Sequence, residues 1–274
     1  MIAGKLLEEA YREIHADILN GVVTSGTTTT LLDSSANGKY QTSKFKNWTL
    51  FMSRTTDAGS PQGRWAIISA SVSNPFSVTF PTITDAPAAG DEYALCKDVV
   101  PLYEAVKQCS RGLRKLGRII NTWDRSLTTA DDTLRYTLPA GIKGIRPNLI
   151  QLEDSVYNPL GVPNWHIEAS AGETQDTLVF EAQPVAAYTL AINYMGFHPE
   201  LTAYNTAING IIPEPVAIAA CVERMLWWKA MPKRRKIDME NWNTAKALLT
   251  ESIQDNKFEV PFFEEQHPPL TMYN

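Results

Sequence analysis

Residues 102–120 have the sequence LYEAVKQCSRGLRKLGRII, and this stretch decides the architecture of the chain. Its apolar residues recur at alternating steps of four and three positions, which is the spacing of one helix face in a coiled-coil-like seam. The seam consists of Leu102, Val106, Cys109, Leu113, Leu116 and Ile120. The spacing predicts an amphipathic helix over residues 98–122 that packs one face against another helix.

A set of basic residues follows the same steps on another face of this predicted helix. It consists of Lys107, Arg111, Arg114 and Arg118. One interpretation is a solvated face opposite the seam. The other is a positive surface that meets phosphates or an acidic neighbour, because guanidinium groups pair well with such anions.

Helical spacing also occurs near both ends of the chain. The N-terminal set, Ala3, Leu7, Ala10, Ile14 and Ile18, predicts a helix over residues 1–20. In the C-terminal third, Pro215 can start a helix that runs to about Met231. A last helix is predicted over residues 238–256, after which the periodicity disappears.

Two long segments between these helices have β character. Residues 22–97 are rich in Thr, Ser, Gly and Pro, and short β-branched or aromatic runs recur within them. Residues 133–200 show a similar pattern, and their last two runs, 177–180 and 188–194, predict a hairpin. Short runs separated by turn residues are typical of antiparallel sheets.

The order of these segments predicts an α+β fold. Each predicted helix can bury only one face, so we expect helices that lie far apart in the sequence to pack together. They would form a discontinuous helical bundle from residues 1–21, 98–132 and 213–256. Two antiparallel β modules, 22–97 and 133–200, would be inserted in this bundle, and residues 257–274 would form an extended C-terminal arm.

Composition restricts the class of protein. The chain has 274 residues, 44% of them hydrophobic, and a formal net charge of −5, which excludes a disordered chain and argues against a basic DNA-reading domain. The charged N-terminus is not expected to be a secretion signal, and no apolar run is long enough to span a membrane. Three cysteines in a chain of this length fit a reducing compartment.

The sequence carries no motif that marks an enzyme or a metal site. It has no phosphate-binding glycine loop, no dinucleotide fingerprint and no G-x-S-x-G elbow. The four histidines, His15, His166, His198 and His267, are scattered, and no C-x-x-C pair occurs. We therefore expect no enzymatic activity, no cofactor and no metal. An enzyme or a carbohydrate-binding module that uses the β segments remains an alternative.

The C-terminal arm is both acidic and aromatic. From Glu251 onward the chain has five acidic residues, three of them in the arm, and one lysine, a net charge of 1 − 5 = −4. Its apolar residues are Phe258, Val260, Phe262, Phe263, Leu270 and Tyr273. Exposed apolar clusters favour association. The arm therefore either folds back on its own subunit or docks on a neighbour or partner, with these six residues as docking candidates.

Several segments resemble proteins of tailed-bacteriophage particles. Residues 26–33 (GTTTTLLD), 48–51 (WTLF) and 90–95 (GDEYAL) resemble a β module common in their virion proteins. A second set of segments resembles the neck-adaptor pattern, in which prolines lead into the following helices. This set consists of 136–139 (YTLP), 178–180 (LVF), 188–194 (YTLAINY), 199–202 (PELT) and 212–213 (IP). The chain is thus similar to the head–tail connector family, the adaptor or gateway proteins.

This resemblance implies a ring of identical subunits, usually twelve, in the neck of the virion below the portal. The implied partners are the portal protein, which the arm would reach, a downstream tail or stopper protein, and double-stranded DNA that passes through without specific contacts. No membrane contact and no cofactor are implied. A stopper, tail terminator or collar protein is the alternative, and the role of residues 22–97 stays open.

A closed ring needs side-by-side contacts between two different surfaces of each subunit. Lys107, Arg111, Arg114 and Arg118 are therefore candidate subunit-interface residues. We expect Arg111 and Arg114 to contact acidic groups on an adjacent chain.

Overall fold

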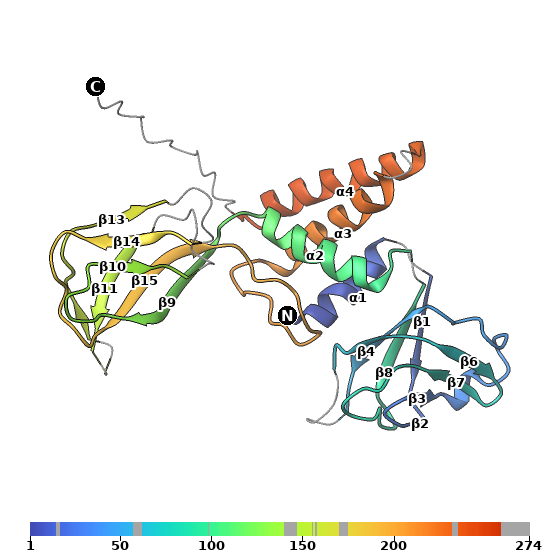
Figure 1. The fold of residues 1–274 in the computed structure, drawn as a ribbon. Coiled ribbons are helices and arrows are strands. Elements are labelled where there is room, and N and C mark those ends of the chain that lie inside the picture. The colour runs from blue at the N-terminus through green and yellow to red at the C-terminus, as the bar shows by residue number, and fades with distance from the viewer. Residues whose placement is uncertain are drawn as a thin grey trace. The chain divides into compact units, whose positions relative to one another are not determined.

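A computed structural model describes most of the chain (Figure 1). The described residues are 1–14, 17–56, 62–97, 99–139, 147–154, 156, 158–169, 175–231 and 235–258. Within them the chain forms four α-helices, a short 3-10 helix at Ser34–Ala36 and four antiparallel β-sheets. The prediction that helices and antiparallel sheets are combined in one chain is therefore confirmed.

The four helices come from separate parts of the sequence. They are α1 (Ala3–Glu13), α2 (Leu102–Lys115), α3 (Glu214–Ala230) and α4 (Lys236–Asp255). α3 contacts each of the other three helices. Its buried side chains include Val216, Ala217, Ala220, Cys221 and Met225. α3 is thus the helix on which the others pack.

A glycine lets α2 lie close to α3. Gly112 on α2 faces the backbone of α3, and a Cβ at this position would lie 2.4 Å from the carbonyl oxygen of Ala220. The close approach brings the Sγ of Cys109 to 3.8 Å from the Sδ of Met225 in the buried contact between the two helices. The contact therefore depends on a residue without a side chain at position 112.

The first β region has two four-stranded sheets. One has the order β1 (Ile18–Val22), β8 (Glu92–Cys96), β4 (Thr49–Arg54), β5 (Trp65–Ile67). The other has the order β2 (Ser25–Gly26), β3 (Thr30–Leu32), β7 (Phe76–Thr79), β6 (Ala70–Ser73). Leu50 and Tyr93 from the first sheet join Leu31 and Val78 from the second in one buried apolar cluster. The two sheets therefore pack face to face.

α1 connects this β region to the other helices. The ring of Tyr11 packs against that of Phe51 on β4, with centroids 5.7 Å apart. The buried carboxylate of Glu8 accepts hydrogen bonds from the hydroxyl of Ser53 at 2.7 Å and from Arg12 at 2.6 Å. Because buried polar groups need hydrogen-bond partners, these contacts fix α1 against the sheet.

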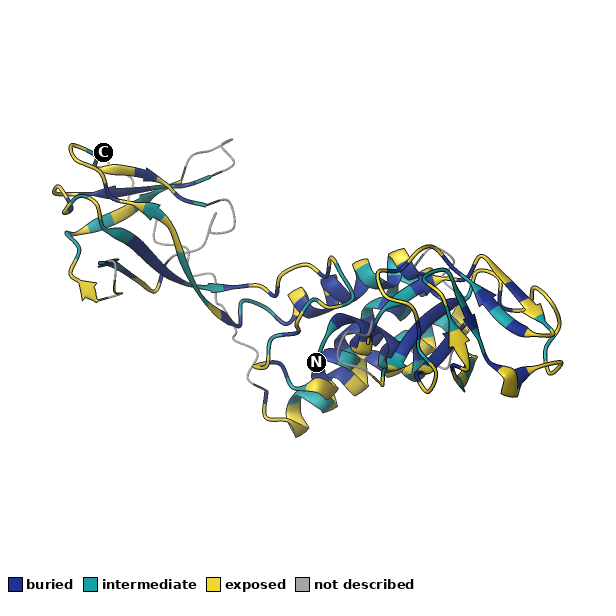
Figure 2. Cartoon of the chain, turned by 90° about the horizontal axis from the view of Figure 1, so that it is seen from below, coloured by how far each residue is buried: buried dark blue, intermediate teal, exposed yellow. Residues whose placement is uncertain are grey.

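The second β region has a four-stranded and a three-stranded sheet. The first has the order β12 (Pro159–Leu160), β11 (Leu149–Glu153), β15 (Thr189–Gly196), β9 (Ile120–Thr128). The second has the order β10 (Arg135–Thr137), β14 (Thr177–Phe180), β13 (Trp165–Glu168). Side chains of both sheets again share one apolar cluster. β14 and β15 each bury at least three consecutive residues, whereas the single buried residue of β10, Tyr136, lies between two exposed residues; Figure 2 colours the chain by burial.

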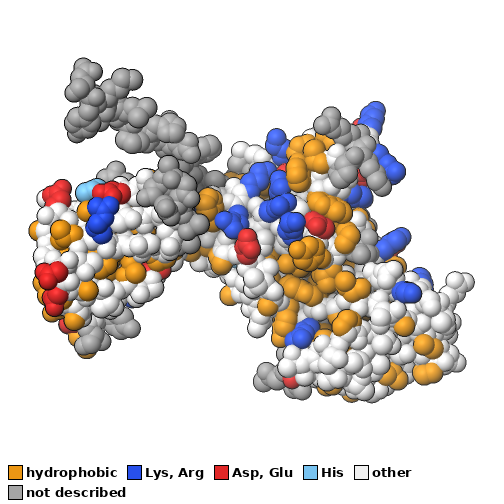
Figure 3. Space-filling model, viewed as in Figure 1, with side chains coloured by type: hydrophobic (Ala, Val, Ile, Leu, Met, Phe, Trp, Pro, Cys, Tyr) orange, Lys and Arg blue, Asp and Glu red, His pale blue; other side chains and the backbone are white. Residues whose placement is uncertain are grey.

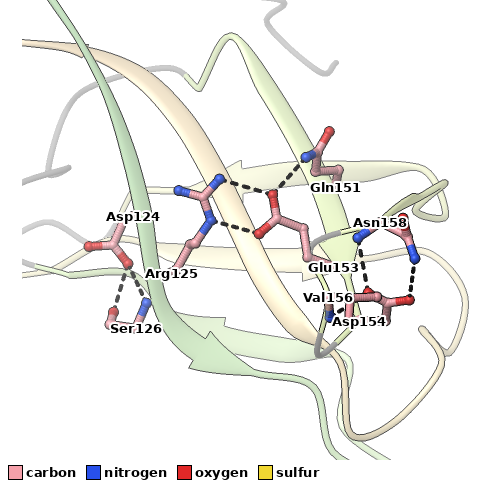
Figure 4. A network of polar contacts seen from close by, with 8 residues as sticks. All are labelled: Asp124, Arg125, Ser126, Gln151, Glu153, Asp154, Val156 and Asn158. Atoms are coloured by element: carbon pink, nitrogen blue, oxygen red, sulfur yellow. Dashed lines mark hydrogen bonds and ion pairs between the residues drawn. The ribbon is translucent and has the colours of Figure 1, made fainter.

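An ion pair between a buried carboxylate and an exposed guanidinium crosses the four-stranded sheet of this region (Figure 4). Arg125 on β9 donates to the carboxylate of Glu153 on β11 from Nε at 2.6 Å and from Nη2 at 3.0 Å. The amide of Gln151 donates to the same carboxylate at 2.9 Å. These hydrogen bonds, chiefly those from Arg125, hold the pKa of Glu153 below its usual range. Since β15 lies between β9 and β11, the pair links the strands on either side of it.

The chain divides into two compact units. The first unit comprises residues 1–117 and 198–274, and the second comprises residues 118–197. The first unit therefore contains the helices and the first β region, and the second unit contains the second β region. Among the helices described, none has both the length and the apolar character that crossing a membrane requires.

The N-terminal helix is shorter than its spacing predicts. The pattern predicts a helix over residues 1–20, but α1 ends at Glu13. Ile18, which continues the helical spacing, lies on β1 and pairs with Cys96 on β8. The pairing partner is far away in the sequence, so the local period gives no sign of this strand.

α2 also ends earlier than predicted, at Lys115 rather than near residue 122. Gly117 has a φ of 95°, the left-handed conformation that favours glycine and ends many helices. Ile120, the last residue of the predicted seam, begins β9 and pairs with Gly196 on β15. β9 therefore lies inside the segment 98–132 that the pattern assigns to the helical bundle.

The predicted hairpin between residues 177–180 and 188–194 does not form. β14 pairs with β10 and β13, whereas β15 pairs with β11 and β9. The connection between the two strands crosses from one sheet to the other, so the prediction was wrong about their pairing.

Candidate functional site

α2 carries three of the four residues of the predicted basic stripe. Lys107, Arg111 and Arg114 lie on this helix and are exposed. Arg118 follows the end of α2 and belongs to the second unit, where its guanidinium lies 5.3 Å from the ring centroid of Phe197. The prediction that all four basic residues lie on one helix was therefore wrong for Arg118, because Gly117 ends the helix before it.

A groove runs along this side of α2. It has a volume of about 650 Å³ and lies between α2 and the segment at residues 200–201. Its lining includes Tyr103, Val106, Lys107, Arg111, Arg114 and Leu201, which we call the α2 surface. Tyr103 is 73% exposed although it is aromatic. The backbone N–H of Leu201 donates to the hydroxyl of Ser110 at 2.7 Å and holds the segment beside the helix.

Two cations of the α2 surface are not neutralised within the part of the chain that the structure describes. Arg114 pairs with Glu200 at 3.2 Å, but neither Lys107 nor Arg111 has an ion-pair partner among the described residues. Like charges four positions apart on a helix repel each other by about 0.2–0.5 kcal/mol. An arrangement that keeps this repulsion is suited to a surface that meets an anionic partner.

Basic and hydrophobic side chains lie next to each other on the helical part of the first unit (Figure 3). On the α2 surface, Tyr103 and Val106 lie one to two helical turns before Arg111. Protein interfaces commonly combine an aromatic or aliphatic centre with charges at its rim. The combination therefore favours a protein partner with both apolar and acidic side chains.

Behind the α2 surface a buried carboxylate connects three helices. Glu223 on α3 is only 1% exposed. One of its oxygens lies 3.1 Å from the Nζ of Lys115 on α2, and the other accepts a hydrogen bond from the indole N–H of Trp242 on α4 at 2.8 Å. A buried charge is stable only when it is paired and hydrogen-bonded. This network therefore fixes the positions of α2 and α4 on α3.

Arg224 adds a further cation beside Arg111. Its guanidinium lies 4.1 Å from the ring centroid of Trp227 on the same helix. Burial lowers the pKa of Arg224, and repulsion by Arg111 lowers it further, whereas Glu223 raises it. Glu223 and Arg224 were not predicted from the sequence. The available signal was a Glu-Arg pair inside the mostly apolar helix at residues 215–231.

The first docking candidate of the C-terminal arm packs inside its own chain. Phe258 is 9% exposed, and its backbone N–H donates to the carbonyl of Ile253 on α4 at 2.9 Å. Phe258 is therefore not available to a partner, contrary to the prediction. The other candidates, Val260, Phe262, Phe263, Leu270 and Tyr273, lie outside the described residues.

Side chains with nucleophilic or metal-binding chemistry are buried or lie apart. The three cysteines, Cys96, Cys109 and Cys221, are buried free thiols. Burial raises the pKa of Cys96 to about 12 and lowers that of His198, whose Nδ1 lies 2.7 Å from the carbonyl oxygen of Pro199. Across the described ranges, no three His, Cys, Asp or Glu side chains are grouped so that they could hold a metal ion. His15 and His267 lie outside those ranges.

The sequence matches no protein-family model and no curated protein. The charges and apolar side chains of the α2 surface therefore carry the functional argument.

Proposed function

We propose that this protein is a structural component of a tailed-bacteriophage particle, the head–tail connector of the neck, and that it is made in the host cytoplasm. Its copies form a ring below the portal, extend the DNA channel and dock the tail. It catalyses no reaction and uses no cofactor. The observation that supports this proposal best is the α2 surface. There Lys107 and Arg111 lie beside apolar side chains and have no ion-pair partner in the described part of their own chain.

In this proposal the helices form the discontinuous bundle of each subunit. α3 contacts α1, α2 and α4, which supports a bundle built from distant parts of the sequence. The two β regions are the modules inserted between its helices, and residues 257–274 form the arm. Such a subunit places a rigid helical body next to its neighbours and leaves the β regions for contacts with other particle proteins.

The ring closes through one repeated contact. Copies arranged in a ring meet through two different surfaces, one on each side of the subunit. We assign the α2 surface to one side, with Arg111 facing acidic groups of the adjacent chain, whereas Arg114 already pairs with Glu200 of its own chain. Lys107 belongs to the same side because it is exposed one turn before Arg111. Charge complementarity of this kind fixes register and excludes wrong partners.

The net charge of such a ring suits the passage of DNA. With the twelve copies that the resemblance implies, the summed charge is 12 × (−5) = −60. A channel of that sign repels the phosphates of double-stranded DNA and lets the duplex slide rather than hold it. The same charge is unfavourable for a protein that binds DNA tightly.

The arm makes the contact with the portal. Leu270 and Tyr273 are apolar residues near its distal end and serve as anchors on the portal in this proposal. The other side of the ring receives a downstream tail or stopper protein.

Electron microscopy of the purified full chain, alone and mixed with portal, tests the function. We expect closed rings whose symmetry follows that of the portal, and we expect the protein in purified particles by mass spectrometry. Sixfold rings would instead indicate a stopper or a tail terminator. A monomer that is missing from finished particles would refute the proposal.

A further inference from the structure

The α2 surface has a chemical order along the helix. Tyr103 and Val106 stand at its N-terminal end, and Lys107, Arg111 and Arg114 continue towards its C-terminal end. Tyr103 and Arg111 are eight residues apart, which corresponds to about 12 Å along a helix axis. Since Lys107 is four residues and Arg111 eight residues after Tyr103, a partner segment that matches this surface needs an aromatic group followed, about 6–12 Å further on, by a carboxylate.

The chain itself contains such a segment. Residues 259–265 have the sequence EVPFFEE, in which the aromatic pair Phe262 and Phe263 precedes the acidic pair Glu264 and Glu265. Residues 259–274 contain three acidic residues and no Lys or Arg, a net charge of −3. In an extended conformation residues two apart lie on the same side of the chain, and the two steps from Phe263 to Glu265 would cover about 7 Å. Spacing, charge and polarity therefore match those of the α2 surface.

Phe258, the last described residue before this segment, is buried and its backbone N–H donates to Ile253 on α4, so the inference concerns the residues after it. A contact between the segment and α2 joins two different surfaces of the chain. Between copies, such a contact repeats head to tail, which is the kind of contact that closes a ring.

We infer that residues 259–265 of one copy bind the α2 surface of a neighbouring copy. Because alternate side chains of an extended segment face the same side, Phe263 packs against Tyr103 and Val106, and Glu265 pairs with Lys107 or Arg111. This inference rests on the proposed function, since it names the acidic group that meets α2 in the ring. The distal residues Leu270 and Tyr273 remain available to the portal.

Two full-length variants test the inference by complementation. The tail variant carries Phe262→Ser, Phe263→Ser, Glu264→Gln and Glu265→Gln, and its α2 surface is intact. The α2 variant carries Lys107→Glu and Arg111→Glu, and its tail is intact. We expect neither variant to assemble alone, whereas an equal mixture forms pairs through the one intact combination. Native mass spectrometry measures the masses of these species.

Each outcome of this experiment shows whether residues 259–265 of a neighbouring copy or another group bind the α2 surface. If the tail variant assembles like the wild type, α2 meets a different group, so the inference fails and the ring proposal stands. If wild type assembles but the mixture stays monomeric, the segment does not bind between copies, and the inference also fails.

A peptide assay separates this inference from the ring proposal. Fluorescence anisotropy measures binding of a labelled peptide of residues 259–274 to the tail variant, whose own segment does not compete. We expect binding that weakens at least tenfold when Lys107→Glu and Arg111→Glu are added, and that weakens with added salt. The matched control, Lys39→Glu with Lys46→Glu, makes the same charge change at exposed positions of the first β region and should change binding less than twofold.

Ring formation without peptide binding would overturn the inference alone. Peptide binding by a chain that never forms rings would overturn the proposed function and leave the docking contact. A labelled DNA duplex serves as a second probe. If it binds through Lys107 and Arg111 while the peptide does not, the α2 surface is a phosphate site and the inference is wrong.

Discussion

Replacing Gly112 with alanine tests how closely α2 is held against α3. The new methyl group would lie 2.4 Å from the carbonyl oxygen of Ala220, 2.8 Å from its carbonyl carbon and 3.2 Å from the Cγ of Arg224. Ordinary contacts of a Cβ begin near 3.4 Å, so the closest approach is about 1 Å too short. Because that contact is with backbone, it cannot be relieved by turning a side chain, and the two helices have to move apart.

Two effects of this substitution oppose each other. Alanine favours the interior of a helix over glycine by about 0.8–1.0 kcal/mol. Overpacking a core costs about 1–3 kcal/mol, and a clash with backbone belongs in the upper part of that range. The expected net loss in the free energy of unfolding is therefore about 1–2 kcal/mol. For a unit of this size, such a loss lowers the Tm by about 2–8 °C.

Thermal and urea unfolding of the full chain, followed by circular dichroism, measures this loss. Gly210→Ala is the control, because a Cβ at Gly210 meets nothing within 4 Å. We expect the control to stay within about 0.5 kcal/mol of wild type. If Gly112→Ala unfolds at the same temperature as wild type or above it, the close approach of α2 and α3 is not as described.

Three further predictions concern the buried polar groups and the arm. Glu153→Gln should destabilise the second unit by about 1 kcal/mol at neutral pH, because the exposed guanidinium of Arg125 loses its charged acceptor. The pKa of Glu153 is lowered in the fold, so this stabilisation exists above the usual Glu value of about 4.3 and disappears as the pH falls through the lower folded value. Acid titrations of wild type and variant measure it, and identical acid unfolding would contradict the pair. Trp242→Phe should lower the free energy of unfolding by about 1–2 kcal/mol, because the buried carboxylate of Glu223 loses a hydrogen-bond donor. An unchanged urea midpoint would show that this hydrogen bond does not stabilise the fold. Deleting residues 259–274 should leave the Tm nearly unchanged, because Phe258 is retained, but should prevent copurification with the portal, whereas a large fall in Tm would show that the arm packs on its own subunit.

Local patterns predicted the elements that depend on local spacing. α3 and α4 lie within two residues of the helices predicted from Pro215 and from residue 238. Most of the short apolar runs of both β segments became strands, because alternation and turn residues are local signals. Leu102, Cys109 and Leu113 of the predicted seam are buried, whereas Val106 is only half-buried and lines the groove of the α2 surface.

Features that depend on distant partners could not be predicted in this way. Ile18 and Ile120 fit a helical period but pair with strands far away in the sequence. The role of Glu223 depends on Lys115 and Trp242 from two other helices. The three basic residues on α2 were found because a helix face has a regular period, whereas Arg118 was misplaced because the helix end at Gly117 was missed.

The mass of the assembled protein, with and without reversal of the α2 charges, tests the central claim most directly. Mass photometry of the full chain, alone and with portal, should give closed rings for the wild type and for Lys39→Glu with Lys46→Glu. Lys107→Glu with Arg111→Glu should give a folded monomer with the circular dichroism spectrum of the wild type. Rings formed equally well by that variant would contradict the assignment of the α2 surface to contacts between copies.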